Sequence, residues 1–426
     1  MNDRAFADFQ QQITPLKNFF LGRQPIFDRQ QKLFAYELLF RRSPCGAANI
    51  DDDLSATATV IAHAAELGME KVIGESFGFI NVDAAVLQSD FVKILPRQKI
   101  VLEILESVEA SNEVVHQVHT LHRAGFRFAL DDVIGHSENV QKFLPFAHIV
   151  KLDISLIAVE DLPSLVRSLH AANKKLVAEK VEDQQQFELC FNLGFEYFQG
   201  YYFAKPAVLS GKKIAPSEKA VLEILDLLNS DADNSEIEVA IKQHVTLSLN
   251  LLRLVNTPAV GCQMRVASLA QALLLLGRRQ LQRWLQILLY AKTGKDGICN
   301  QPLLLLASTR GKLLELIAKK LHPNDRIVVD TAFTVGIMSL MDSLFGVTME
   351  EILQQMRVVD EVSAALLHRT GMYGEMLRLA ESIEHIDDSC PVMAEMLAHL
   401  HLSEEEFYLL ELDAFDWADK LTRSQF

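Results

Sequence analysis

The chain has 426 residues, of which 49% are hydrophobic and 23% are charged, and its formal net charge at pH 7 is −15. A single hydrophobic core rarely serves a chain of this length, so at least two domains are expected. The acidic balance argues against non-specific binding to duplex nucleic acid or to an anionic membrane, because both favour a basic protein surface. A small phosphate ligand is not excluded, because a few basic residues in one pocket are enough to bind it.

The five cysteines are scattered along the chain and show no C-x-x-C spacing. Reduced thiols of a cytoplasmic protein fit this pattern better than disulfides or a zinc knuckle. The N-terminal segment MNDRAFADFQ lacks the apolar centre of a secretory signal. The apolar run around Leu273–Leu276 stops at Gly277, and no segment is expected to span a membrane.

Short apolar runs alternate with amphipathic helical stretches between residues 19 and 203. The candidate strands are 33–40, 77–82, 100–105, 127–132, 148–154, 175–181 and 197–203. Helical stretches such as NEVVHQVHTLHRAG and DQQQFELCFNLG lie between them and end at residues suited to a helix C-terminus. This alternation predicts a parallel sheet covered on both faces, and the number of units favours a closed α/β barrel. An open doubly wound sheet is the alternative.

The patterning changes after the stretch AKPAVLSGKKIAPSEK, whose prolines and glycine are typical of a linker. Beyond it the chain shows almost no strand pattern and carries leucines at helical spacing, as in ASLAQALLLLG and QLQRWLQILLY. The sequence therefore predicts a barrel domain over residues 1–206, a linker over 207–216 and an all-helical domain over 217–426.

Polar side chains occur in six of the predicted strands, mostly toward their C-terminal ends. They are Glu37, Asn81, Glu103, Asp131, Asp132, Lys151, Asp153 and Glu179. Ionised groups do not belong inside apolar strands unless they are paired or bind metal. In an α/β barrel these strand ends open onto one face, where active sites are assembled. Oxygen donors in this number suit Mg²⁺ or Mn²⁺, and structural ion pairs are the alternative.

Such a site suits phosphodiester chemistry. Two divalent ions roughly 3.5–4 Å apart can stabilise the attacking and leaving oxygens of the displacement. Lys151 is placed to orient a water or neutralise phosphoryl charge, and Arg41 is a candidate for clamping the phosphate. The alternative for Arg41 is a surface position after the strand. A metal-dependent barrel lyase or aldolase is a weaker alternative for the whole site.

Several segments resemble, in order and spacing, the motifs of the EAL family of cyclic-di-GMP phosphodiesterases over about residues 19–206. The segment QPIF, followed by Glu37-Leu38-Leu39-Phe40-Arg41, is similar to Q-P-I followed by E-A-L-L-R. FINVDAA, LEILES and FALDDV are similar to its metal-binding segments, and IVKLD, VAEKVED and FQGYYFAKP to its later motifs. The resemblance implies a TIM-like barrel of the EAL type that hydrolyses cyclic-di-GMP to linear pGpG with Mg²⁺ or Mn²⁺.

The resemblance also implies roles for individual residues. The implied metal ligands are Glu37, Asn81, Glu103, Asp131 and Asp132, of which Asp132 completes the second metal site. Lys151 is expected to contact the catalytic water, and Glu179 to act as general base or ligand; with Asp132 they form the expected catalytic set. The implied substrate contacts are Gln24, Arg41 and Gln199.

The chain departs from the family pattern at three places. Val133-Ile134-Gly135-His136 stands where the family usually has F-G-T-G, a loop linked to metal binding and to the contact between subunits of a homodimer. Arg42 replaces a tryptophan and Lys180 replaces a glycine. Because neighbours of metal ligands tune metal affinity, the alternative is a catalytically inactive signalling protein that binds cyclic-di-GMP or a protein partner.

Residues 217 to about 400 resemble an HDOD domain. LSLNLLRLVNTPAVG and ASLAQALLLLGRRQLQRW are similar to two motifs of that family. Ser339 and Leu340 fall where the related HD hydrolases have histidine and aspartate, so this half is expected to perform no catalysis. The resemblance implies a regulatory module that binds a protein partner.

Overall fold

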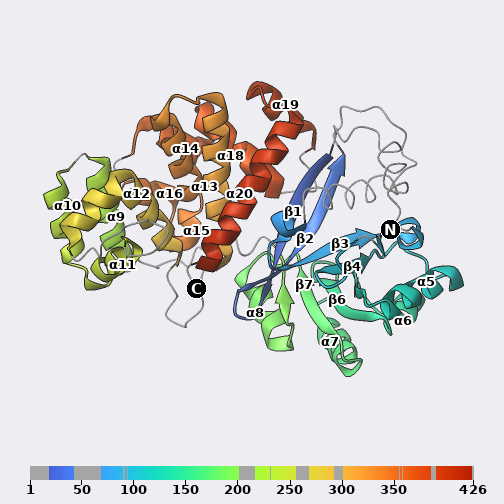
Figure 1. Ribbon diagram of the computed structural model, residues 1–426. Coiled ribbons are helices and arrows are strands. Elements are labelled where there is room, and N and C mark those ends of the chain that lie inside the picture. Colours follow the sequence, from blue (N-terminus) through green and yellow to red (C-terminus); the bar gives the residue numbers. More distant parts are fainter. Residues whose placement is uncertain are drawn as a thin grey trace. The chain divides into compact units, whose positions relative to one another are not determined.

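The computed structural model describes residues 19–42, 69–89, 92–93, 95–200, 216–230, 232–255, 268–291, 301–354, 356, 358–384 and 390–424. By its internal contacts the chain divides into two compact units (Figure 1). The first comprises Met1–Lys205 and Glu381–Lys420, and the second comprises Pro206–Ala380 and Leu421–Phe426. A C-terminal stretch of the chain therefore belongs to the unit that holds the N-terminal strands.

Eight strands of the first unit close into a barrel, in chain order around its wall. They are β1 (Phe19–Asp28), β2 (Leu33–Arg42), β3 (Phe77–Val82), β4 (Ile100–Ile104), β5 (Arg127–Leu130), β6 (Ala147–Asp153), β7 (Lys175–Glu179) and β8 (Tyr197–Phe198). The predicted closed α/β barrel is confirmed, and the open sheet is wrong. The expectation of a wholly parallel sheet is also wrong, because β1, which the strand pattern missed, runs antiparallel to β2 and β8.

A tight hairpin sets the direction of β1. The Asp28 carboxylate accepts hydrogen bonds from the backbone N–H groups of Gln30 (2.9 Å) and Lys32 (2.8 Å), and Gln31 adopts a left-handed conformation with φ 57°. A connection this short joins only antiparallel strands, since a parallel crossover needs a dozen or more residues. The polar segment DRQQK between two apolar runs is the sequence signal for this hairpin.

Short helices follow most of the remaining strands. They are α3 (Met69–Ile73), α4 (Ala84–Gln88), α5 (Asn112–Arg123), α6 (Glu138–Phe143), α7 (Leu162–Ala171) and α8 (Gln184–Leu193). Four of them begin at a side chain that accepts a hydrogen bond from the first helical turn, namely Asp83, Ser111, Ser137 and Asp183. These caps satisfy backbone N–H groups that the helix itself cannot.

The barrel interior contains an apolar layer with one side chain from each strand. Its members are Ile26, Ala35, Phe79, Val101, Ala129, Ile149, Val177 and Tyr197. Phe34 covers this layer, stacking on the ring of Tyr197 with centroids 3.9 Å apart. Such layers are the packed core of an α/β barrel, and this one forms the floor beneath the next set of inward-facing residues.

The second unit is helical throughout its described residues, as the leucine spacing predicts. Its helices are α9 (Pro216–Asn229), α10 (Asn234–Lys242), α11 (Val245–Val255), α12 (Leu269–Ala291), α13 (Gln301–Leu321), α14 (Arg326–Met338), α15 (Met341–Phe345), α16 (Met349–Leu353), α17 (Asp360–His368) and most of α18 (Gly371–Glu384). Two further helices, α19 (Cys390–His399) and α20 (Glu404–Ser424), lie largely in the first unit.

One stretch of the second unit, Arg326–Phe345, is long and apolar enough by composition to cross a membrane, with a mean hydropathy of 1.5. The expectation that no segment meets this test is therefore wrong. The stretch is interrupted between α14 and α15, and 56% of its most apolar window is buried within the protein. Core helices of globular domains have this character.

The helix α20 packs on β1 and β2 through a buried ion pair. The Arg23 guanidinium lies 2.9 and 3.1 Å from the two carboxylate oxygens of Asp419, and the Tyr36 hydroxyl donates to the same carboxylate at 2.6 Å. The guanidinium is flanked by the rings of Tyr36 (4.0 Å) and Phe415 (3.9 Å). All four residues belong to the first unit, so the C-terminal helix is part of the barrel's packing.

Ionisation of Glu411 should limit stability at high pH. Glu411 lies on α20 and is 1% exposed, and burial raises its pKa to about 8, opposed by Arg23. Tyr408 is the other titratable group that faces it. Because the folded-state pKa lies above the ordinary value, stability is lost as pH rises from about 4.5 through 8. Glu411→Gln, which cannot ionise, should show a Tm advantage over the wild type that widens across this range in thermal unfolding followed by circular dichroism.

The matched control is Glu405→Gln, which alters an exposed glutamate of the same helix. Its Tm difference from the wild type should not change with pH. A Tm difference for Glu411→Gln that is equally flat between pH 4.5 and 9 would contradict the assignment.

Candidate metal-dependent active site

The predicted site residues meet because they form the next layer of the barrel interior. Side chains alternate along a strand, so positions two residues from the apolar layer face inward again. On the seven parallel strands β2 to β8 these positions are Glu37, Asn81, Glu103, Asp131, Lys151, Glu179 and Gln199, where Asp131 and Gln199 directly follow their strands. On the antiparallel β1 the equivalent position lies two residues earlier, at Gln24.

Lys151 occupies the centre of this layer. Its Nζ lies 2.9 Å from Glu37 Oε2, 2.7 Å from Glu179 Oε1 and 3.4 Å from Asp131 Oδ1, and it also pairs with Glu103 Oε1. The side chain is 1% exposed. Burial by itself would lower the pKa of Lys151, but the four carboxylates outweigh that effect and raise the pKa well above its ordinary value. Lys151 therefore carries its charge at any physiological pH.

Amide side chains extend the network to the neighbouring strands. Gln199 Nε2 donates to Gln24 Oε1 and to Glu37 Oε2, both at 2.7 Å, and Asn81 Nδ2 donates to Glu37 Oε1 at 3.4 Å. Gly200 fixes the backbone after Gln199, because it has φ 145° and a Cβ there would lie 2.4 Å from the backbone of Val181. The predicted residues Gln24, Glu37, Asn81 and Gln199 are thus brought together.

Burial makes the acidic groups of the site costly to ionise. It raises the pKa of Glu179 to about 8, with Lys151 opposing the shift, and it raises the pKa of Glu103 in the same way. Asp132 also has a raised pKa, through burial and then the charge of Asp131. A carboxylate in such surroundings takes up a proton or binds a cation.

The donor set fits divalent metal ions. Four carboxyl groups (Glu37, Glu103, Asp131 and Glu179) share the ammonium of Lys151, which would leave three negative charges if all were ionised. Asp132 adds a fifth carboxyl group beside Asp131. Asn81 Oδ1, Glu103 Oε2 and Glu179 Oε2 are buried oxygens without a hydrogen-bond partner among the described residues. Two trios, Glu37–Glu103–Glu179 and Glu106–Asp131–Asp132, each bring ligand atoms within 4.8 Å of one another. Oxygen-only donors of this kind suit hard divalent cations.

Glu106 is an acidic residue beside the candidate site that the sequence interpretation did not name. It follows β4 within the segment LEILES, but it lies outside the strand and its alternation, so nothing singled it out. In the structure it joins Asp131 and Asp132 beside a cavity of about 320 Å³, which the loop residues 133–136 also line. Residues 133–136, where the sequence departs from the family pattern, therefore line this cavity.

Lys180 introduces a second ammonium near the site. Its Nζ pairs with Asp153 Oδ2 at 2.6 Å, and Asp153 is fully buried. Lys180 has φ 52°, the left-handed conformation that favours glycine, which explains why a glycine suits this position in the family pattern. Lysine in place of glycine at position 180 adds a positive charge that also acts on Asp132.

The predicted phosphate contact of Arg41 involves a side chain that the structure does not describe. Arg41 lies in β2 opposite Phe20, but its side chain is outside the described residues, so its phosphate contact stays a prediction.

In the helical unit, Ser339 is buried at the end of α14, where its hydroxyl donates to the Gly336 carbonyl (2.7 Å) and accepts from Arg310 (3.0 Å). Leu340 beside it is also buried.

Both halves of the chain match known domain families. Residues 7–206 match the EAL domain and residues 214–368 match the HDOD domain. The two matches together take in most of the chain, with the EAL domain first and the HDOD domain after it.

Two curated relatives share this extent. The uncharacterized protein YuxH of Bacillus subtilis is 28% identical over 410 residues, covering 94% of this chain and 98% of that protein. Cyclic di-GMP phosphodiesterase CdgJ of Vibrio cholerae is 29% identical over 375 residues, covering 86% and 85%. Among solved structures, an EAL domain protein from Listeria monocytogenes is 25% identical and covers 48% of this chain and 93% of its own, with a TM-score of 0.37.

Removing the central ammonium should destabilise the metal-free protein. Lys151→Met leaves the buried carboxylates without their counter-charge, so the free energy of unfolding should fall by about 3–5 kcal/mol in a chelating buffer. Mn²⁺ should restore part of the loss, because a divalent cation neutralises the same oxygens. The measurement is urea unfolding followed by tryptophan fluorescence.

The matched control is Lys142→Met, which removes an exposed ion pair with Glu138 on α6. Its free energy of unfolding should be close to that of the wild type, with or without metal, because exposed ion pairs contribute little to stability. Equal losses for the two variants would contradict the central role of Lys151.

Proposed function

We propose that the protein is a metal-dependent phosphodiesterase that hydrolyses cyclic-di-GMP to linear pGpG, coupled to a regulatory HDOD module. The observation that carries this proposal is the layer of inward-facing polar residues at the mouth of the barrel, in which four carboxyl groups surround a single lysine and Asp132 lies beside them. The similarity to a relative named as a cyclic di-GMP phosphodiesterase, over 86% of this chain, supports the choice of substrate.

The residues of the candidate site have three proposed roles: holding metal ions, assisting the attack of water, and contacting the substrate. The residues that would hold Mg²⁺ or Mn²⁺ are Glu37, Asn81, Glu103, Asp131 and Asp132, and such ions supply Lewis acidity and a more acidic bound water. Lys151 offers a positive charge to the phosphoryl oxygens, and Glu179, with its raised pKa, is suited to accept a proton from the attacking water. Gln24, Gln199 and Arg41 are the proposed substrate contacts.

The remaining assignments follow from the sequence and the family. We propose that the protein is cytoplasmic, that the HDOD module binds a protein partner, and that two copies associate through the loop after Asp132. The 62% exposure of Ile134 in that loop is consistent with such a contact, because a large apolar side chain is held in water there.

The second candidate function is a receptor that binds cyclic-di-GMP without hydrolysing it. The ion pair between Lys180 and the buried Asp153 favours this candidate, because it places a fixed positive charge beside the acids of the second trio. A cation fixed at that point competes electrostatically with a metal ion.

Incubation of the purified full chain with cyclic-di-GMP and Mg²⁺ or Mn²⁺ tests the proposal. The wild type should release pGpG, measured by chromatography, and a chelator should stop the reaction. Glu37→Ala should slow it by about 100-fold or more, because losing a ligand costs at least as much as losing a neighbour of a ligand. Glu138→Ala, on the exposed surface of α6, should leave the rate unchanged.

Calorimetric titration with cyclic-di-GMP separates the two candidates. Binding by the wild type without turnover in either metal would overturn the enzyme and support the receptor. Loss of turnover in Glu37→Ala with binding retained would support the enzyme.

A further inference from the structure

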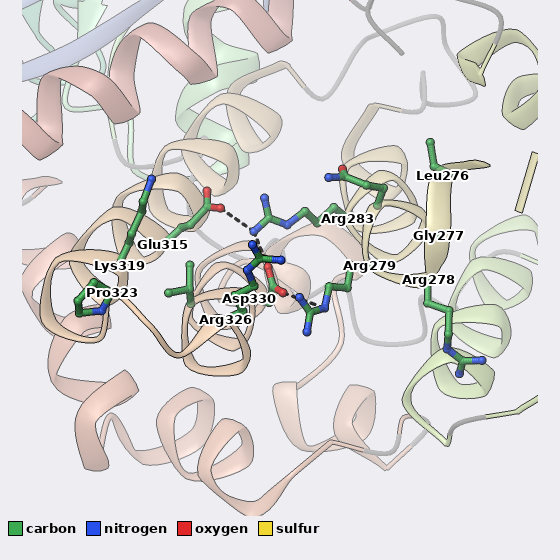
Figure 2. A pocket seen from close by; sticks show the side chains of 12 residues that line it. Leu276, Gly277, Arg278, Arg279, Arg283, Glu315, Lys319, Pro323, Arg326 and Asp330 are labelled. Carbon is green, nitrogen blue, oxygen red and sulfur yellow. Dashed lines mark hydrogen bonds and ion pairs between the residues drawn. The ribbon is translucent and has the colours of Figure 1, made fainter. Parts of the chain in front are cut away.

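A cavity of about 800 Å³ lies in the helical unit between α12, α13 and α14 (Figure 2). Five of its lining residues are basic, namely Arg278, Arg279, Arg283, Lys319 and Arg326, and two are acidic. This excess of positive charge occurs in a chain whose net charge is −15. The net charge of the cavity lining is therefore opposite in sign to the net charge of the chain, and it favours an anionic ligand.

The two acidic residues hold the innermost arginine in place. Arg283 Nη2 lies 2.6 Å from Glu315 Oε1 and 2.9 Å from Asp330 Oδ1, and its guanidinium stacks 4.4 Å from the Phe333 ring. Asp330 Oδ2 also forms an ion pair with Arg279, whose Nε lies 3.2 Å away. Arg283 is thus held by two ion pairs through Nη2, while Asp330 also holds Arg279.

Three cations of the cavity keep donors for a ligand. Arg279 uses only Nε in its ion pair, so both of its terminal nitrogens are without a partner among the described residues. Lys319 and Arg326 make no hydrogen bond or ion pair with any described residue. Figure 2 shows Arg279 and Arg326 reaching toward the same part of the cavity around Asp330. A phosphate group has the oxygens to accept from both arginines.

A break in α12 adds backbone donors to the same cavity. Gly277 has φ 72° and ψ 161°, so the helix stops there and a second helical segment starts at Arg278. The first N–H groups of a helix have no partner within it, and they favour phosphate. Arg278 anchors the break by donating to the Leu228 carbonyl at 3.0 Å and to the Ala232 carbonyl.

Close packing of α13 against α14 fixes the opposite walls. A Cβ at Gly336 would lie 2.6 Å from the backbone of Arg310, so the two helices touch backbone to backbone at this point. Lys319 on α13 and Arg326 on α14 are thereby held on two helices whose spacing cannot widen without losing this contact. The cavity is built by rigid elements.

We propose that this cavity binds a small phosphate-bearing molecule, whose phosphate oxygens contact Arg279 and Arg326, with Lys319 adding positive charge to the lining. A volume of about 800 Å³ accommodates a ligand of nucleotide size. The apolar side chains of Leu276, Pro323 and Val329 line the rest of the cavity and can pack against the non-phosphate part. This assignment gives the helical module a ligand of its own, and it does not rest on the proposed function of the barrel.

Calorimetric titration of the full chain with inorganic pyrophosphate, in a chelating buffer, tests the proposal. The metal-free barrel site is crowded with carboxylates and should repel this probe. Arg279→Gln and Arg326→Gln should each weaken binding about tenfold, as loss of one charge-assisted contact predicts. Arg378→Gln, at an exposed arginine of α18 that does not line the cavity, should bind as the wild type does.

Failure of the wild type to bind pyrophosphate, or equal binding by the two cavity variants and the wild type, would overturn the proposal. So would binding of a polyglutamate peptide without binding of pyrophosphate, which would make the cavity a docking site for acidic protein segments. Arg326 is exposed and unpaired among the described residues, so Arg326→Gln should fold normally, as circular dichroism would verify.

Discussion

The two-residue alternation of side chains in a closed barrel is the constraint on which the site depends. Once Phe79, Val101 and Val177 pack in the floor layer, the residues two positions further on must face one another across the barrel. Polar side chains at those positions meet whatever their separation in the sequence, which reaches 175 residues between Gln24 and Gln199. The packing of the apolar layer therefore decides which polar side chains meet at the mouth of the barrel.

The two layers have opposite effects on stability. The apolar layer supports the fold by removing its side chains from water, whereas the layer above it concentrates like charges in a buried space. Lys151 offsets only part of that repulsion, because it is one cation among four acids. The barrel thus holds a strained electrostatic arrangement on a rigid apolar base, as functional sites commonly do.

Much of the barrel and its site could be predicted from the sequence, because strands with acids near their C-terminal ends are a local pattern. The strand β1 was missed because FFLGRQPIFD mixes glycine, arginine and proline with its apolar residues. Gln24 came only from the family resemblance, and Glu106 was missed because it follows a strand. The basic cavity was also missed, since Arg279 and Arg326 are far apart in the sequence and only the packing of α12 against α14 brings them together.

The docking of α20 on β1 has a consequence for how the chain is made. The ribosome synthesises the barrel strands first, yet Asp419 and Phe415, which enclose Arg23, emerge only after the helical unit. Until then Arg23 and Tyr36 lack the Asp419 carboxylate and the Phe415 ring that enclose them in the folded chain. The barrel unit therefore completes its packing only when the end of the chain has been made. Proteolytic removal of that end would also remove part of the barrel unit.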